Sequence, residues 1–205
     1  MSPIVGLTYG KDERIPPRAR ILAVAEDLFY RHGIRAVGVD AIAEAAGTNK
    51  MTLYRHFGSK DDLVAAYLRQ AAQEADGCWA RLEQAHPGDA RAQLRAWLEE
   101  MAQHVANADQ RGCPLANAAV ELPEKDHPAR RVIEEFKVAQ RAKLIQLCRI
   151  AGLSEPDMLA DELHLLLEGA RVTAQSVGSD GLGVRLVRMG EAMIAAHAAP
   201  PPASR

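Results

Sequence analysis

The 205-residue sequence has few aromatic residues, few cysteines and no long hydrophobic run. Aromatic residues make up 4% of the chain, alanine is abundant and β-branched residues are sparse, which favours helices over a β-sandwich. No window approaches the roughly 18 uncharged apolar residues of a transmembrane helix. The first residues also lack the basic start and apolar run of a signal peptide. These absences predict an all-α cytoplasmic protein with no membrane partner.

The three cysteines, Cys78, Cys113 and Cys148, are an odd number and lie far apart. They form no CxxC pair, and no histidine stands beside them at zinc-ligand spacing, so the sequence predicts a reduced protein without a metal or other cofactor. The chain also lacks a nucleophile elbow, a phosphate-binding glycine loop and an HExxH motif. His104 and Cys113 are a formal catalytic pair, but nothing in the sequence places them together. An enzyme is therefore the disfavoured alternative.

Apolar residues make up 48% of the chain and charged residues 25%, which is the composition of a folded globular protein. Apolar positions that recur with the period of a helix, together with glycine, proline and capping residues, divide the chain into nine helices and no strand. Ser59 with Asp62 is a capping box, Asp89 is a helix cap, and Ser154 starts the eighth helix. The predicted helices cover about 16–32, 39–46, 50–57, 59–84, 89–108, 113–122, 126–151, 155–177 and 182–197.

The helix over 39–46, the glycine-containing turn at 47–49 and the helix over 50–57 have the lengths of a helix-turn-helix. That pattern alone is weak, because glycine-linked helix pairs occur in many all-α proteins. The helix over 50–57 also carries five polar side chains around a thin apolar seam, and these side chains suit phosphate and base contacts. Residues 1–60 carry a formal charge of +3 and residues 61–205 a charge of −5, so the total of −2 hides a basic end.

The segment VDAIAEAAGTNKMTLYRHFGSKDDLVAAYL (39–68) resembles the DNA-binding domain of the TetR family of bacterial transcriptional regulators. The features that carry the resemblance are the glycine turn, a recognition helix reading K-x-T-x-Y-R-H-F, a Gly-Ser-Lys junction and an acidic start to the next helix. The resemblance covers about residues 17–68. Val37-Gly38 departs from the family pattern, which often has Thr or Ser there as a cap and phosphate contact. The resemblance places these residues at DNA: Lys50, Met51, Thr52, Tyr54, Arg55, His56 and Lys60.

Each of these residues has an assigned role and a plainer alternative. Thr52, Tyr54 and His56 would contact phosphates, although Tyr54 would also suit packing against the first helix and His56 suits a helix C-terminus by charge alone. Lys50 and Met51 would face base edges, and Arg55 would reach a base or a phosphate. Met51 suits packing equally well. Lys60 would anchor the DNA backbone, or would be a solvated charge.

The resemblance also implies a ligand pocket among the middle helices and a dimer interface formed by the last two. Each pocket residue is alternatively plain core or surface, and the interface residues are alternatively an intrachain core. The implied pocket residues are Trp97, Met101, His104, Cys113, Asn117, Phe136, Gln140, His164, Glu168 and Arg171. The implied interface residues are Leu159, Leu163, Leu166, Ala170, Leu186, Met189 and Met193.

Cys113 precedes Pro114 at a predicted helix N-terminus, where the helix dipole would make its thiol more reactive. A redox or electrophile switch is one interpretation of this cysteine, and a buried structural thiol is the other.

The sequence as a whole predicts a homodimeric transcriptional repressor that binds a palindromic operator and is released by a small-molecule inducer. The predicted parts are a flexible arm at 1–15, a DNA-binding domain at 16–60, a ligand-binding and dimerisation domain at 61–197, and a disordered tail at 198–205. A helical small-molecule binder without DNA affinity is the second alternative, and steep salt dependence of operator binding would exclude it.

Overall fold

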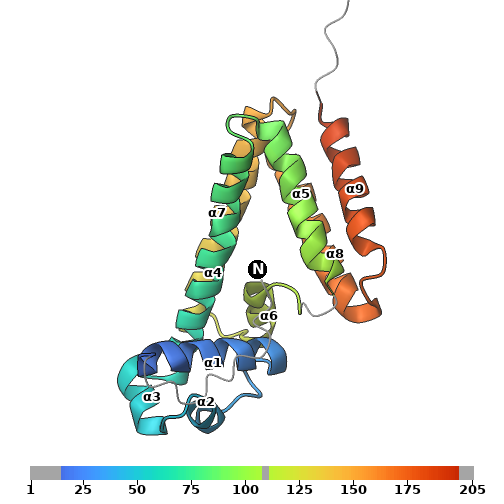
Figure 1. The fold of residues 1–205 in the computed structure, drawn as a ribbon. Helices are drawn as coiled ribbons and strands as arrows, with labels where there is room; N and C mark the ends of the chain where they lie inside the picture. The colour runs from blue at the N-terminus through green and yellow to red at the C-terminus, as the bar shows by residue number, and fades with distance from the viewer. Residues whose placement is uncertain (1–14, 108–110, 199–205) are drawn as a thin grey trace, which may run out of the picture. The chain divides into compact units, whose positions relative to one another are not determined.

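The computed structural model describes residues 15–107 and 111–198, and in these ranges it has nine helices and no strand. One isolated bridge joins Leu153 and Ala198. The all-α prediction is confirmed, whereas the predicted arm and tail lie outside the described residues except for Ile15 and Ala198. The helices are α1 (Pro17–His32), α2 (Val39–Ala45), α3 (Lys50–Phe57), α4 (Lys60–Ala85), α5 (Ala90–Ala106), α6 (Pro114–Glu121), α7 (Pro128–Ile150), α8 (Pro156–Val177) and α9 (Leu182–Ala196) (Figure 1).

The chain forms two compact units. Unit 1 contains the residues up to Ala72 together with Pro114–Ile133, and unit 2 contains Gln73–Cys113 and the residues from Glu134 onward. Helices α4 and α7 therefore each begin in unit 1 and continue in unit 2. None of the helices in the described ranges is long and apolar enough to span a membrane.

In unit 1, α1, α2 and α3 pack on one another around a small apolar core (Figure 1). Ile21 from α1, Ile42 from α2 and Leu53 from α3 are fully buried there. The first half of α4 adds a further buried layer, in which the ring of Tyr67 lies 5.8 Å from that of Phe29 between centroids. Burying these apolar side chains is the main favourable term that holds the short helices α2 and α3 together.

Local caps fix where the helices of unit 1 end. Gly47 has a φ of 62°, a conformation that costs a glycine little, and it turns the chain between α2 and α3. The Asn49 side chain then accepts the backbone N–H of Thr52 at 2.9 Å and caps α3. Ser59 Oγ accepts the backbone N–H of Asp62 at 3.0 Å and donates to the Asp62 carboxylate at 2.6 Å, so the predicted cap at the start of α4 is confirmed.

In unit 2, α5, α8 and α9 lie side by side, and the second halves of α4 and α7 complete the bundle (Figure 1). The core includes fully buried leucines on α5, α7, α8 and α9, among them Leu94 of α5 and Leu163 of α8. Helix α9 approaches α5 closely at two glycines. A Cβ on Gly190 would stand 2.6 Å from Leu98 Cδ2, and one on Gly183 would stand 2.8 Å from the carbonyl oxygen of Ala102. The two tryptophans, Trp79 and Trp97, stack with centroids 6.3 Å apart.

Candidate functional site

Helix α3 is divided between a buried and an exposed face. Leu53 and Phe57 are buried against unit 1, whereas Met51 is 82% exposed and Lys50 and Arg55 also face solvent. The Tyr54 ring is exposed and Thr52 is half-buried. An exposed helix of this composition presents hydroxyl, ammonium and guanidinium donors together, and phosphates and guanine edges accept hydrogen bonds from such donors.

Three of the residues that are expected to contact DNA either interact with other groups of the protein or are shielded by it. Lys50 Nζ lies 3.2 Å from Asp40 Oδ2 in an exposed ion pair. The ammonium of Lys60 donates to the carbonyl oxygen of Ile34 at 2.7 Å, and burial lowers the pKa of Lys60 despite the nearby carboxylate of Asp61. His56 Nε2 is shielded from solvent and has no hydrogen-bond partner among the described residues. The DNA roles of these residues stay predictions.

A buried arginine supports the helix-turn-helix from within. Arg20 Nε donates to the carbonyl oxygen of Ala46, the C-cap residue of α2, at 3.2 Å, and Arg20 Nη1 donates to that of Ile15 at 2.9 Å. Helix C-termini leave carbonyl groups without partners, and an arginine satisfies one of them here. In the sequence alone, Arg20 is only one of the positive charges of residues 1–60. Its position next to Ile21, at the edge of the apolar face of α1, could have indicated that this arginine is buried.

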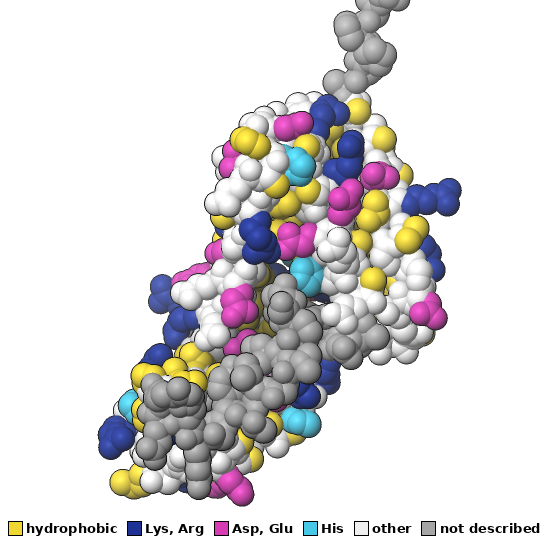
Figure 2. Space-filling view, viewed as in Figure 1, with side chains coloured by type: hydrophobic (Ala, Val, Ile, Leu, Met, Phe, Trp, Pro, Cys, Tyr) yellow, Lys and Arg dark blue, Asp and Glu magenta, His cyan; other side chains and the backbone are white. Residues whose placement is uncertain are grey.

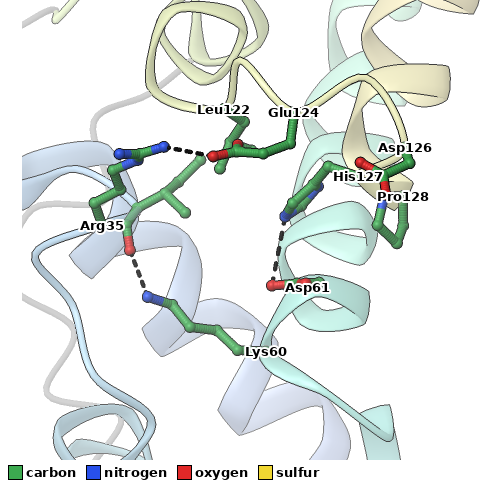
Figure 3. A pocket seen from close by; sticks show the side chains of 9 residues that line it. Arg35, Lys60, Asp61, Leu122, Glu124, Asp126, His127 and Pro128 are labelled. Atoms are coloured by element: carbon green, nitrogen blue, oxygen red, sulfur yellow. Dashed lines mark hydrogen bonds and ion pairs between the residues drawn. The ribbon is translucent and has the colours of Figure 1, made fainter.

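A second arginine fastens the segment after α6 to the loop after α1 (Figure 3). Arg35 donates from its backbone N–H to the Glu121 carboxylate at 3.1 Å, from Nε to the Glu121 carbonyl at 2.6 Å and from Nη2 to Glu124 at 2.9 Å. His127 Nε2 faces Asp61 Oδ1 at 3.4 Å, and the backbone N–H of Ala129 donates to His127 Nδ1 at 3.1 Å. Together these contacts join three sequence-distant segments of unit 1, and we call those of Arg35 the Arg35 clamp.

The clamp borders an open pocket of about 470 Å³. Lys60, Asp61 and His127 line it together with the residues around Arg35 and Glu124 (Figure 3). Within it Arg35 pairs with Glu124, His127 faces Asp61, and Lys60 donates to the carbonyl oxygen of Ile34. The hydrogen bonds of Arg35 and Lys60 at its edge hold the loop that leads into α2.

Comparison with known proteins shows which family has this architecture. Residues 21–67 match the model of bacterial regulatory proteins of the tetR family. The solved structure of sav143 from Streptomyces avermitilis, described as a TetR-type transcriptional regulator, is 32% identical with a TM-score of 0.78, over 89% of this chain and 98% of that one. The chain belongs to the TetR family. Members of this family are DNA-binding transcriptional regulators and are not enzymes, which is the class of function that the sequence predicted.

Two curated transcriptional regulators match part of the chain. The transcriptional activator FasR of Mycolicibacterium smegmatis is 42% identical over 60 residues, which are 29% of this chain and 26% of FasR. The transcriptional repressor KstR2 of Rhodococcus jostii is 38% identical over 89 residues, which are 43% of this chain and 42% of KstR2. The chain thus aligns with less than half the length of either protein.

The ten residues expected in a TetR-family ligand pocket are divided between the units. Asn117 belongs to unit 1 and the other nine belong to unit 2. Gln140 accepts the Trp79 Nε1–H at 2.9 Å, and Trp79 stacks on Trp97. Arg171 contacts both Glu168 and Met101, while His104 Nδ1 lies 2.7 Å from the carbonyl oxygen of Glu100 in its own helix. The half-buried Phe136 and His164 lie on α7 and α8.

The residues expected at a dimer interface lie on two faces. Leu159, Leu163 and Leu186 are buried inside unit 2, and Ala170 is buried with them. Leu166 and Met193 are partly buried against the same core. Met189 is half exposed. Other apolar residues of α8 remain uncovered, and these are Met158, Leu165, Val172 and Val177.

The three cysteines are free thiols and all are buried. Burial raises the pKa of Cys148 to about 11, and burial together with the neighbouring Glu100 raises the pKa of Cys78 to about 12. Neither is a reactive thiolate at neutral pH, because only the deprotonated form is a good nucleophile. Cys113 precedes α6 as expected, and its role as a switch stays a prediction.

Proposed function

We propose that this TetR-family protein is a homodimeric repressor that binds a palindromic operator and leaves it when a small molecule binds unit 2. The observation that carries the DNA-binding part is the exposed face of α3, where Met51, Tyr54 and Arg55 face solvent on a capped and supported helix. The visible face of unit 2 instead shows acidic and basic side chains interspersed with hydrophobic ones (Figure 2).

The proposed dimer rests on an apolar stripe along α8. Met158, Leu165 and Val172 follow one another at seven-residue intervals and are 55%, 71% and 63% exposed. A seven-residue apolar repeat faces one side of a helix and packs against another helix. Two copies of one eight-residue recognition helix also read twice the DNA of a single copy, and a two-fold dimer matches a palindromic site.

The ligand response is supported by chain continuity. Helix α4 starts beside the recognition helix in sequence and runs without interruption into unit 2. A ligand that binds one arrangement of α4 better than another would shift the population towards that arrangement. We assign repression rather than activation because KstR2, the repressor, matches over a longer segment than the activator FasR.

DNA binding is tested with a duplex that the wild-type protein selects from a random library. Fluorescence anisotropy across a salt series then compares Lys50→Ala and Tyr54→Ala with the charge-matched control Lys143→Ala in unit 2. Each α3 substitution should weaken binding by about tenfold or more, and Lys50→Ala should reduce the salt slope by about one ion. The control should bind like the wild type. Equal affinity in all four proteins would exclude α3 as the DNA-reading helix.

Dimerisation is tested by analytical ultracentrifugation. Leu165→Glu places a charge in the α8 stripe and should give a monomer. Val138→Glu adds the same charge at an exposed apolar residue of α7 and should leave the dimer intact. A dimeric Leu165→Glu protein, or a monomeric wild type, would contradict the proposed interface.

A further inference from the structure

Three charged side chains meet between α7 and α8 inside unit 2. Lys137 Nζ lies 2.9 Å and Arg171 Nη1 lies 2.7 Å from the same oxygen of Glu168, Oε1. Their side chains are only 24%, 22% and 26% exposed, respectively. Half-buried ion pairs of this kind lose much of their hydration, so the balance of charge in the group matters more than it does at an open surface.

The group has one positive charge in excess. Burial alone would raise the pKa of Glu168, but Arg171 and Lys137 together lower it, so this carboxylate is ionised at neutral pH. His164 adds no charge there, because burial and the nearby Lys137 lower its pKa. Two cations therefore share one carboxylate, and an anion would balance the remaining charge.

The guanidinium of Arg171 also has a donor with a poor partner. Its Nη1 points at Glu168, whereas its Nη2 meets the sulfur of Met101 at 3.8 Å. A thioether is a weak acceptor, and the planar guanidinium fork fits the two oxygens of a carboxylate. The Met101 side chain is flexible and apolar, so it can pack against the apolar part of a ligand that lies beside its sulfur.

We propose that Lys137 and Arg171 bind the carboxylate of a small organic acid, and that Met101 contacts the acid's apolar part. This inference rests on the ligand response proposed above and specifies the chemical class of the ligand. In it, Glu168 is the internal competitor that the ligand carboxylate displaces from Arg171. The family resemblance implied Glu168, Arg171 and Met101 as pocket residues but not Lys137, whose partner Glu168 lies 31 residues away.

The two tryptophans supply a built-in reporter. Trp97 precedes Met101 by one turn on α5, and Trp79 stacks on Trp97, so both indoles belong to the same unit as the charged group. They are the only tryptophans of the chain. Intrinsic fluorescence of the full-length protein therefore follows binding to unit 2 without a label and without DNA.

The test titrates the protein with acetate, benzoate and decanoate and with the matching neutral amides. At least one carboxylate should change the fluorescence saturably, and its amide should bind at least tenfold more weakly. Arg171→Gln and Lys137→Met should weaken carboxylate binding by about tenfold, whereas Glu168→Gln should strengthen it severalfold by removing the competitor. Arg141→Gln is the control, since Arg141 forms an exposed ion pair with Asp161 one turn from Lys137.

Circular dichroism establishes that each variant is folded, and Arg171→Lys, which keeps the charge but loses the fork, should fall between the wild type and Arg171→Gln. The proposal is overturned if no carboxylate binds, if the amides bind equally well, or if Arg171→Gln binds like the wild type. Release of the selected DNA is measured separately. Carboxylate binding without DNA release would support the carboxylate site but overturn the proposed ligand response. DNA release by an amide alone would support the ligand response but overturn the carboxylate site.

Discussion

The two units use their charged side chains in different ways. In unit 1, Arg20, Arg35 and Lys60 donate to backbone carbonyl groups that lie 26 to 86 residues away in the sequence. In unit 2, cations pair mainly with carboxylates, and α5 and α9 approach each other through glycines without any charge. The basic residues near the recognition helix are therefore partly structural, and a count of positive charges overstates what remains for DNA.

The compact unit also differs in charge from the sequence segment that suggested it. Residues 1–60 carry a formal charge of +3, but unit 1 contains 13 Lys or Arg and 11 Asp or Glu, a formal charge of +2. The difference arises at the start of α4, where Asp61 and Asp62 join the unit with only Arg69 to offset them, whereas the distant segment Pro114–Ile133 adds three acidic and three basic residues and no net charge. If α3 is the DNA-reading helix, as proposed, the cations that it presents matter more for binding than the net charge of the unit.

The largest expected effect tests the close approach of helices in unit 2. Gly190→Val should lower the free energy of unfolding by about 3 kcal/mol, because its Cβ alone would stand 2.6 Å from the buried Leu98 side chain. Gly77→Val is the matched control in the same unit, where the nearest atom to a Cβ is the flexible end of Arg81 at 3.4 Å. It should change stability by less than about 0.5 kcal/mol. Urea unfolding followed by tryptophan fluorescence measures both, and equal losses would contradict the packing described.

An intermediate effect tests the buried cation of unit 1. Arg20→Leu should cost about 2 kcal/mol of stability, since it removes charge-assisted hydrogen bonds to the carbonyl groups of Ala46 and Ile15. Arg18→Leu, two residues earlier, loses only an exposed contact with the Phe57 ring at 4.9 Å and should cost less than about 1 kcal/mol. Hydrogen exchange of α2 amides gives the readout. Unchanged exchange in Arg20→Leu would show that this arginine does not hold the end of α2.

The sequence predicted those features whose physical cause lies within a few residues. The turn at Gly47, the cap at Ser59 and the bounds of α3 follow from neighbouring side chains, and each is confirmed. Ser154 was predicted to start α8, and this was wrong. Glu155 occupies the cap position with a φ of 47°, and the Ser154 hydroxyl donates instead to the carbonyl oxygen of His197. That partner is 43 residues away, so no local pattern indicates it.

The candidate sites show the same limit. A repeating apolar pattern on α8 does not say whether Leu163 or Leu165 faces the core, and only the packed unit separates the buried residue from the exposed one. Likewise Lys137 and Arg35 read as solvated charges until their carboxylate partners are brought beside them. Residues whose role depends on a distant partner are therefore the ones that sequence patterns left unassigned.

The smallest expected effect tests the Arg35 clamp. Both Arg35 and Glu124 are more than half exposed, so the ion pair alone is screened and should contribute about 0.5 kcal/mol. A double-mutant cycle of Arg35→Ala and Glu124→Ala should give this coupling at low salt and almost none at high salt. The bond from Arg35 Nε to the Glu121 carbonyl survives in Glu124→Ala, so Arg35→Ala should cost more than Glu124→Ala at every salt concentration. Equal losses of stability in Arg35→Ala and Glu124→Ala would mean that the clamp is only a surface ion pair. Arg35 would then act like the cations of unit 2, which pair mainly with carboxylates.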